Sequence, residues 1–144
     1  MSSLYFAFGS NMSRMRLAQR VGEVEVVGPA RAPGWRHRFN KRGHDGTGKG
    51  NIEPADEYVW GVVYRLSPEQ LRVLDGFEGG YRRCELSAEI HTGAVGVVSY
   101  LGLRPGSSLA PAPWYLEHYR VGIREHALPD AWLAEVELHA TLGS

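Results

Sequence analysis

Hydrophobic and aromatic residues occur in short runs separated by Gly and Pro, a pattern that predicts both strands and helices. The run SLYFAF, residues 3–8, has the length and aromatic content of a buried strand. The next segment, 11–22, changes to helical spacing, with Met12, Met15 and Leu17 as its buried positions. Segments 23–42 and 57–66 are rich in β-branched and aromatic residues and are predicted to be strands.

The second half of the chain continues this alternation. Ser67 is a plausible helix N-cap followed by Pro68, and Leu71 and Leu74 are spaced for one buried face of a short helix that ends near Gly76. Segments 81–93 and 94–103 have the pattern of two strands of a hairpin. Segment 110–141 predicts two helices, broken at Leu128-Pro129.

Composition narrows the class of protein. A chain of 144 residues, 43% hydrophobic and 22% charged, fits one domain spanning residues 1–144. Sixteen basic side chains balance sixteen acidic ones, so no nucleic-acid partner is expected. The lone Cys84 cannot form an internal disulfide, which suits the cytoplasm. We expect neither export nor membrane insertion, because no leader pattern and no apolar run of roughly 20 residues is present.

Two segments, one glycine-rich and one basic, could be taken for sites that bind a nucleotide or a nucleic acid. GHDGTGKG, residues 43–50, has the glycine and lysine spacing of a phosphate-binding loop. Gly50 stands where Ser or Thr would ligate magnesium, and strand-like sequence follows instead of a helix, so we interpret the segment as a connection between strands. The basic run RHRFNKR, residues 36–42, is interpreted as the solvated face of a strand.

The sequence gives little support for a metal site built from histidines or for catalysis by Ser10. The six histidines show no spacing typical of zinc ligands, so no metal site is expected. Ser10 follows a strand and precedes a helix, as in a nucleophile elbow, but Met12 occupies the position where that motif has glycine. A serine-dependent hydrolase that uses Ser10 therefore remains a minor alternative.

The chain turns sharply at Gly9-Ser10-Asn11, between the first strand and the first helix. Such a turn presents several backbone N–H groups, and glycine permits close approach of a ligand. A helix dipole would add positive potential at the same place, so the turn is a candidate site for a carboxylate or an oxyanion. The alternative is that Ser10 or Asn11 only caps the helix.

Glu78 is the candidate acid or base. It lies between Phe77 and a Gly79-Gly80 pair just after the short helix. If the carboxyl group is held near Phe77, and near Trp60 or Tyr81, loss of water around it disfavours the charged form. That environment suits a group that accepts and donates a proton. The alternative is a surface glutamate in a turn.

Three separated elements together resemble the γ-glutamylcyclotransferase family, AIG2-like members included. YFAFGSNM is similar to the family's opening Tyr-Gly-Ser-Asn turn, VWGVVYRLSPEQLRVLDGFEG to its Trp-Gly-Val strand with the following Leu-Asp and Glu-Gly, and APWYLEHYRVGIREHALP to its C-terminal helix. The sequence departs from the family at Phe8, where Tyr is usual, and at Gly80-Tyr81, where the segment after Glu-Gly is shorter.

The resemblance implies an α+β fold, a small mixed-sheet, barrel-like domain flanked by helices. It also implies cyclisation of a γ-glutamyl amide to 5-oxoproline with release of an amino acid or amine, as in glutathione metabolism, and no cofactor. Glu78 would be the general acid/base and Tyr115 a substrate contact. The γ-glutamyl group would bind the turn formed by Tyr5, Phe6, Ala7, Phe8, Gly9, Ser10 and Asn11.

The partner implied by the resemblance is a small γ-glutamyl molecule, and the chain would act as a monomer or homodimer. Family members differ in the amine that they release, so the resemblance does not identify the leaving group. A non-catalytic protein of the same fold that binds a small ligand remains an alternative, although the presence of Glu78 argues against it.

Overall fold

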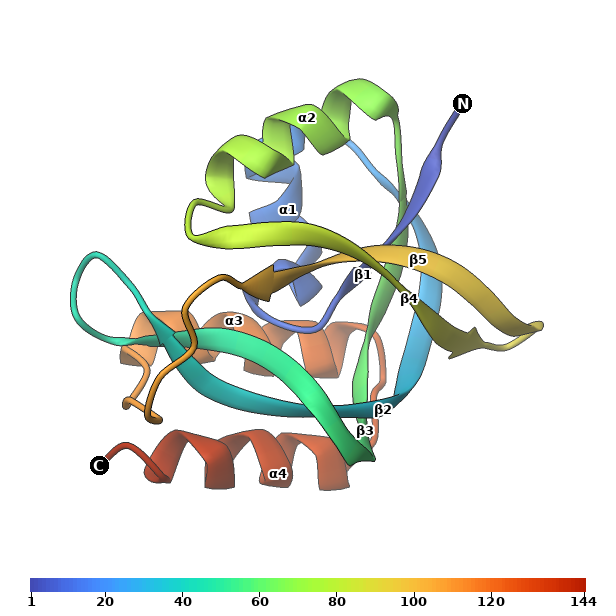
Figure 1. The fold of residues 1–144 in the computed structure, drawn as a ribbon. Coiled ribbons are helices and arrows are strands. Elements are labelled where there is room, and N and C mark those ends of the chain that lie inside the picture. The colour runs from blue at the N-terminus through green and yellow to red at the C-terminus, as the bar shows by residue number, and fades with distance from the viewer.

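The computed structural model describes residues 1–144 and forms a closed five-stranded barrel with four α-helices around it (Figure 1). The α+β, barrel-like class expected from the sequence is confirmed. In chain order the elements are β1 (Ser3–Ala7), η1 (Ser10–Met12, a 3₁₀ helix), α1 (Arg14–Val21), β2 (Glu25–Arg42), β3 (Gly48–Leu66), α2 (Pro68–Phe77), β4 (Tyr81–Ile90), β5 (Gly93–Gly102), α3 (Pro113–Glu125) and α4 (Asp130–Thr141).

The barrel closes in the strand order β1-β3-β2-β4-β5. The long hairpin of β2 and β3 and the shorter hairpin of β4 and β5 are antiparallel, and β2 meets β4 at Arg31 opposite Glu89. β1 pairs antiparallel with β3 and meets β5 in parallel where Tyr5 lies opposite Val98. The first strand, which leads into the Gly9-Ser10-Asn11 turn, is therefore held between two others.

The apolar runs form strands because both of their faces are covered. Val62 and Val63 are adjacent in β3 and neither is exposed. Side chains alternate across a strand, so one of the two points into the barrel and the other away from it. In Figure 1, α1 and α2 lie together in the upper part of the molecule, whereas the lower stretch of β2 and β3 runs between α3, above it in this view, and α4, below it.

The predicted helices of the second half are confirmed. Ser67 Oγ accepts a hydrogen bond from Gln70 N (3.1 Å), and Gln70 Oε1 accepts one from Ser67 N (3.0 Å), a reciprocal cap at the start of α2. The helix ends at Phe77, one residue beyond the expected Gly76. The break between α3 and α4 falls at Leu128-Pro129, as predicted.

The first helix differs from the prediction. Met12 belongs to η1, and α1 starts only at Arg14, with Ser13 as its N-cap: Ser13 Oγ accepts a hydrogen bond from Arg16 N at 3.4 Å. Because Met12 and Met15 lie on different helices, helical spacing does not place them on one face. Met15 is exposed, and the expectation that it is buried was wrong.

The basic run at the end of β2 is only partly solvated. Residues 43–47 form the turn between β2 and β3, which confirms that this segment is a connection. His37, however, is 1% exposed, because α4 covers this part of β2 and places His139 Nδ1 at 3.1 Å from His37 Nδ1. The expectation of a solvated face was therefore wrong at His37 and also at Asn40, which is 6% exposed, whereas Lys41 is half-buried and Arg42 is exposed.

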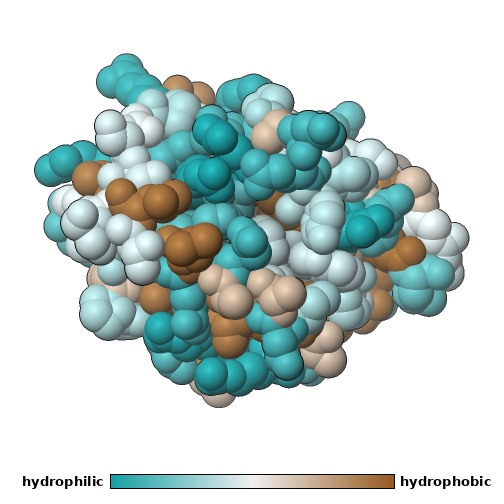
Figure 2. Space-filling model, turned by 90° about the horizontal axis from the view of Figure 1, so that it is seen from below, coloured by the Kyte–Doolittle hydropathy of each residue, from teal (hydrophilic) through white to brown (hydrophobic).

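The surface seen from the side of α3 and α4 is mostly hydrophilic, with hydrophobic side chains in small separate groups (Figure 2). Val121 of α3 and Leu138 of α4 are among the exposed apolar residues. Scattered groups of this kind are ordinary on protein surfaces. None of the helices is long and apolar enough to cross a membrane.

Met12 anchors the turn after β1 to the rest of the fold. Its side chain is fully buried, and its carbonyl oxygen lies 2.8 Å from Tyr64 Oη, which donates to it, and 3.0 Å from His126 Nε2. Gly122 of α3 packs directly on this residue: a Cβ atom at position 122 would lie 2.4 Å from Met12 Cβ. The close approach of α3 therefore depends on glycine.

Gly122→Ala should destabilise the protein by about 1–3 kcal/mol, since the added methyl group must displace Met12 or α3. Gly76→Ala is the matched control, because a Cβ there meets nothing within 4 Å, and it should raise the free energy of unfolding by up to ~1 kcal/mol through helix propensity. Urea unfolding measures both. Equal effects of the two substitutions would contradict the proposed packing.

Candidate active site

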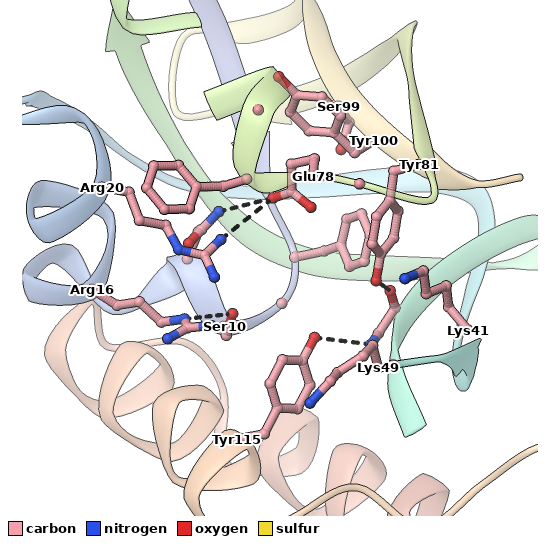
Figure 3. A pocket seen from close by; sticks show the side chains of 18 of the residues that line it. Ser10, Arg16, Arg20, Lys41, Lys49, Glu78, Tyr81, Ser99, Tyr100 and Tyr115 are labelled. Carbon is pink, nitrogen blue, oxygen red and sulfur yellow. Dashed lines mark hydrogen bonds and ion pairs between the residues drawn. The ribbon is translucent and has the colours of Figure 1, made fainter. Parts of the chain in front are cut away.

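A cavity of about 350 Å³ opens beside the Gly9-Ser10-Asn11 turn. Its walls come from the β1–η1 turn, α1, the adjoining ends of β2 and β3, the end of α2, β4, β5 and α3 (Figure 3). Segments that are far apart in the sequence therefore meet at one place.

Most of the residues singled out in the sequence line this cavity: Tyr5, Phe8, Gly9, Ser10, Asn11, Glu78 and Tyr115. Phe6 and Ala7 do not; they are buried in the hydrophobic core, at 0% and 1% exposure. Of the two aromatic neighbours considered for Glu78, Tyr81 lines the cavity and Trp60 does not.

Glu78 is fixed where α2 ends. Its backbone N–H donates to Leu74 O (3.1 Å), and its carbonyl oxygen accepts from Tyr81 N (3.1 Å). Within the last turn of α2, Asp75 accepts hydrogen bonds from Tyr100 Oη and from Arg83, which ties α2 to β5 and β4. The side chain of Glu78, only 14% exposed, points into the cavity (Figure 3).

Two residues contact the carboxylate of Glu78. Asn11 Nδ2 donates a hydrogen bond to Glu78 Oε1 at 3.2 Å, and Arg20 Nη1 lies 3.8 Å from the same oxygen. Burial raises the pKa of Glu78 above its ordinary value, while the charges of Arg20, Arg16 and Lys41 and the Asn11 hydrogen bond act in the opposite direction. The raised pKa agrees with the expectation for a carboxyl group that exchanges protons.

Asn11 connects the turn to Glu78. Its Nδ2 also donates to Tyr5 Oη at 3.1 Å, so both hydrogens of the amide have acceptors. Its Oδ1 is buried and has no partner within the protein. Asn11 therefore holds the Glu78 carboxylate and the Tyr5 hydroxyl in fixed positions, and its own oxygen is closed off from the cavity.

The electrostatics of the turn differ from the expectation. The helix that follows Gly9 directly is η1, a single 3₁₀ turn, and α1 starts beyond it, so the dipole of a long helix does not point at this turn. Arginine side chains supply the positive charge instead: Arg16 Nε donates to Ser10 Oγ at 2.9 Å, and Arg20 extends from the same helix. No hydrogen bond joins Ser10 to a histidine, so the serine lacks the base that a hydrolase would need.

Tyrosine hydroxyl groups form the opposite wall. Tyr115 Oη accepts a hydrogen bond from Gly50 N (2.9 Å), and Tyr81 Oη donates to Gly50 O (2.8 Å). Burial raises the pKa of both Tyr115 and Tyr81, and it raises that of Tyr5 as well. All three hydroxyl groups therefore stay protonated at neutral pH.

Four cationic residues of the cavity were not identified as site residues from the sequence. Arg16 and Arg20 are four residues apart on α1, a spacing that places both on one helix face and could have indicated a shared role. Lys41 and Lys49 lie on β2 and β3. Lys49 drew attention only through its resemblance to a phosphate-binding loop, and Lys41 carried no separate signal.

The family model described as "Gamma-glutamyl cyclotransferase, AIG2-like" matches residues 5–117. The chain is 30% identical over 139 residues to the gamma-glutamylcyclotransferase of Bos taurus, covering 89% of this chain and 73% of that protein. It is 31% identical over 140 residues to the Homo sapiens protein of that name, with 89% and 73% coverage.

A solved structure titled "Gamma-glutamyl cyclotransferase" has the same fold. It superposes with a TM-score of 0.88 at 26% sequence identity, covering 95% of this chain and 87% of its own. The chain therefore has the same fold as this structure.

The raised pKa of Glu78 has a consequence for stability. Ionising this carboxyl group costs more free energy in the folded protein than in the unfolded chain. The group therefore makes its full contribution to the free energy of unfolding at pH values below its unfolded pKa, and this contribution is lost as the pH rises through its folded pKa. Glu78→Gln removes that loss. We expect the stability of the variant relative to the wild type to be higher at about pH 8 than at about pH 4.

Urea unfolding at the two pH values tests this expectation. Glu69→Gln is the control, because Glu69 lies on the same helix with its side chain 82% exposed. A relative stability of Glu78→Gln that stays constant or falls between low and high pH would show that the pKa is not raised.

Proposed function

The chain belongs to the AIG2-like gamma-glutamyl cyclotransferase family, and we propose that it catalyses the cyclisation of a γ-glutamyl amide to 5-oxoproline. The observation that carries the proposal is the largely buried carboxylate of Glu78, which faces the cavity within contact of Asn11 and Arg20. The curated relatives are named for this reaction class, and the geometry of the cavity suits it.

The reaction joins two groups of one substrate molecule. The α-nitrogen attacks the γ-carbonyl carbon, a new C–N bond closes the five-membered ring, and the C–N bond to the leaving amine breaks. Two protons leave the α-ammonium nitrogen and two are gained by the departing nitrogen, so the proton count balances. Glu78 accepts protons from the first nitrogen and returns them to the second, which requires a pKa closer to neutrality than that of an exposed glutamate.

The turn after β1 has the role of positioning the substrate. The α-ammonium group is attracted to the Glu78 carboxylate, which Asn11 of the turn holds in place through the 3.2 Å hydrogen bond. The α-carboxylate of the γ-glutamyl group is attracted to Arg16 and Arg20. Because the attack is intramolecular, holding the folded substrate in this orientation supplies much of the rate enhancement.

Charge also develops on the γ-carbonyl oxygen as the nitrogen attacks. Donors that are already in place stabilise such an oxyanion without reorganising. The backbone N–H groups of Gly9 and Ser10 and the hydroxyl group of Tyr115 border the same cavity and are the candidates, whereas Tyr81 Oη already donates its proton to Gly50 O. The serine-dependent amidase is the weaker alternative, because Ser10 Oγ accepts a hydrogen bond from the cationic Arg16 Nε, which makes this oxygen a poorer nucleophile.

A non-catalytic protein that binds a γ-glutamyl or amino-acid ligand is the second candidate function. The cavity volume and its charged walls would serve that role equally. The placement of Glu78 favours the enzyme, because binding alone gains little from a carboxyl group whose burial raises its pKa.

Glu78→Gln should reduce the release of 5-oxoproline by about 10²–10⁴-fold while the protein remains folded, because the amide keeps the shape of the side chain but cannot transfer protons. Ser10→Ala should retain a large part of the activity, since Ser10 contacts Arg16 and is not the nucleophile in this proposal. Chromatographic assay of 5-oxoproline from γ-glutamyl dipeptides measures both. Near-normal turnover by folded Glu78→Gln would refute the assigned role, and loss of activity in Ser10→Ala alone would favour the amidase.

A further inference from the structure

Positive charge exceeds negative charge in the cavity by a wide margin. Arg16, Arg20, Lys41 and Lys49 line it, whereas Glu78 is the one carboxylate among its lining residues. Arg20 lies 3.8 Å from Glu78, so this pair accounts for one cation. The remaining three are more than a single γ-glutamyl α-carboxylate requires.

The two lysines are placed against each other by the strand register. Lys41 of β2 is the antiparallel partner of Lys49 of β3. Like charges directly opposite each other on neighbouring strands destabilise a sheet, so this pairing has a cost in the absence of an anion. An anionic group that contacts both ammonium groups would relieve the repulsion.

Neither lysine is neutralised by a carboxylate within the cavity. Lys41 has no acidic group within 4.0 Å; its Nζ lies 5.1 Å from the centre of the Tyr81 ring and passes over Gly80, where a Cβ atom would be 2.8 Å from that nitrogen. Lys49 has one partner, Asp45, at 3.5 Å, and the Asp45 side chain is 44% exposed. A ligand carboxylate can therefore replace or join Asp45 at Lys49.

Lys49 is held in place chiefly by aromatic rings. Its side chain is 16% exposed, and its Nζ lies 4.6 Å from the ring centres of both Trp114 and Tyr115. Lys49 Nζ also donates to Asp45 Oδ2 at 3.5 Å and to Thr47 Oγ1 at 3.4 Å, so one of its three N–H donors remains available to a ligand. Lys41 lies instead against Gly80 and the ring of Tyr81, where β4 begins.

The arginines and lysines lie on opposite sides of Glu78. In Figure 3, Arg16 and Arg20 approach from α1, and Lys41 and Lys49 approach from the β2–β3 hairpin. With the γ-glutamyl carboxylate on the arginine side, next to the turn, the scissile bond lies near Glu78 and the leaving group extends toward the lysines. The leaving group of the substrate therefore occupies the lysine side of the cavity.

We propose that Lys41 and Lys49 form a subsite for the carboxylates of the leaving group, and that the preferred substrates are γ-glutamyl conjugates of an acidic amino acid. This inference rests on the proposed function. A leaving glutamate or aspartate carries two carboxylates, one for each lysine, whereas a neutral amino acid carries one and a simple amine carries none. Lys41 and Lys49 are then the residues that determine leaving-group specificity.

The test compares γ-glutamylglutamate with γ-glutamylglutamine, which have nearly the same shape and differ by one carboxylate. For the wild type we expect kcat/KM to be about tenfold or more higher for γ-glutamylglutamate, the size expected of a charge-assisted hydrogen bond. The advantage should lie mainly in KM, because the distal carboxylate is bound equally in the ground state and the transition state.

Because each lysine binds one carboxylate, the two substitutions should differ in effect. Of Lys41→Gln and Lys49→Gln, the one that removes the partner of the distal carboxylate should reduce the preference to within about threefold, and the other should raise KM about equally for both dipeptides. Replacing the distal-carboxylate lysine by Arg instead of Gln should restore most of the preference, since it restores the charge. Arg42→Gln, which removes an exposed cation from the next position of the same strand, outside the cavity, should keep the wild-type preference.

Each outcome has a distinct meaning. Equal turnover of the two dipeptides by the wild type, or an unchanged preference in both Lys41→Gln and Lys49→Gln, would overturn the subsite and leave the cyclotransferase assignment intact. Absence of 5-oxoproline from both dipeptides with folded wild type would instead refute the proposed function. Competitive inhibition by micromolar ATP or inorganic phosphate, without any preference for γ-glutamylglutamate, would show that the lysines serve phosphate anions and would also overturn the proposal.

Discussion

Glu78 is held at the end of α2 with most of its carboxyl group removed from water, and the other polar contacts of the cavity are arranged around this constraint. A carboxylate in such a place is unfavourable unless cations and donors compensate it. Arg20 and Asn11 supply part of that compensation, and burial still has the larger effect on its pKa. The result is a carboxyl group in a fixed position whose pKa is raised above its ordinary value.

The barrel provides the rigidity that this arrangement requires. β1 is paired on both sides, so the turn that carries Asn11 starts from a fixed point, and the Met12 carbonyl secures its far end through Tyr64 and His126. On the other side of the cavity, Asp75 ties α2 to β4 and β5. Both partners of the Asn11–Glu78 hydrogen bond therefore stand on elements with little freedom to separate.

Sequence patterns predicted most of the local structure and identified the candidate site residues that lie in recognisable motifs. Ser67 and Pro68 specify the start of α2, and the apolar runs specify the strands, because these signals act over a few neighbouring residues. The closure of the barrel was expected only from the family resemblance. Met15 was misplaced because a three-residue 3₁₀ helix interrupts the helical spacing, and no pattern in the sequence distinguishes that turn from the first turn of α1.

The cationic side of the cavity could not be derived from sequence for a different reason. Lys41 and Lys49 face each other only through the register of a long hairpin that contains three irregularities, and each irregularity changes which side chains share a face. His37 is buried because α4, a hundred residues later in the chain, covers β2. Contacts between distant segments of this kind depend on the assembled fold, whereas Glu78 could be found because Phe77 and the glycine pair surround it in sequence.

The identity of the product from a substrate and its N-acetyl derivative tests the central claim most directly. In an intramolecular cyclisation the free α-nitrogen is the nucleophile, so mass spectrometry should find 5-oxoproline from a γ-glutamyl dipeptide and no product from the same dipeptide acetylated on that nitrogen. Release of glutamate from the first compound, or of N-acetylglutamate from the second, would mean that water or a protein side chain attacks the γ-carbonyl and would contradict the account.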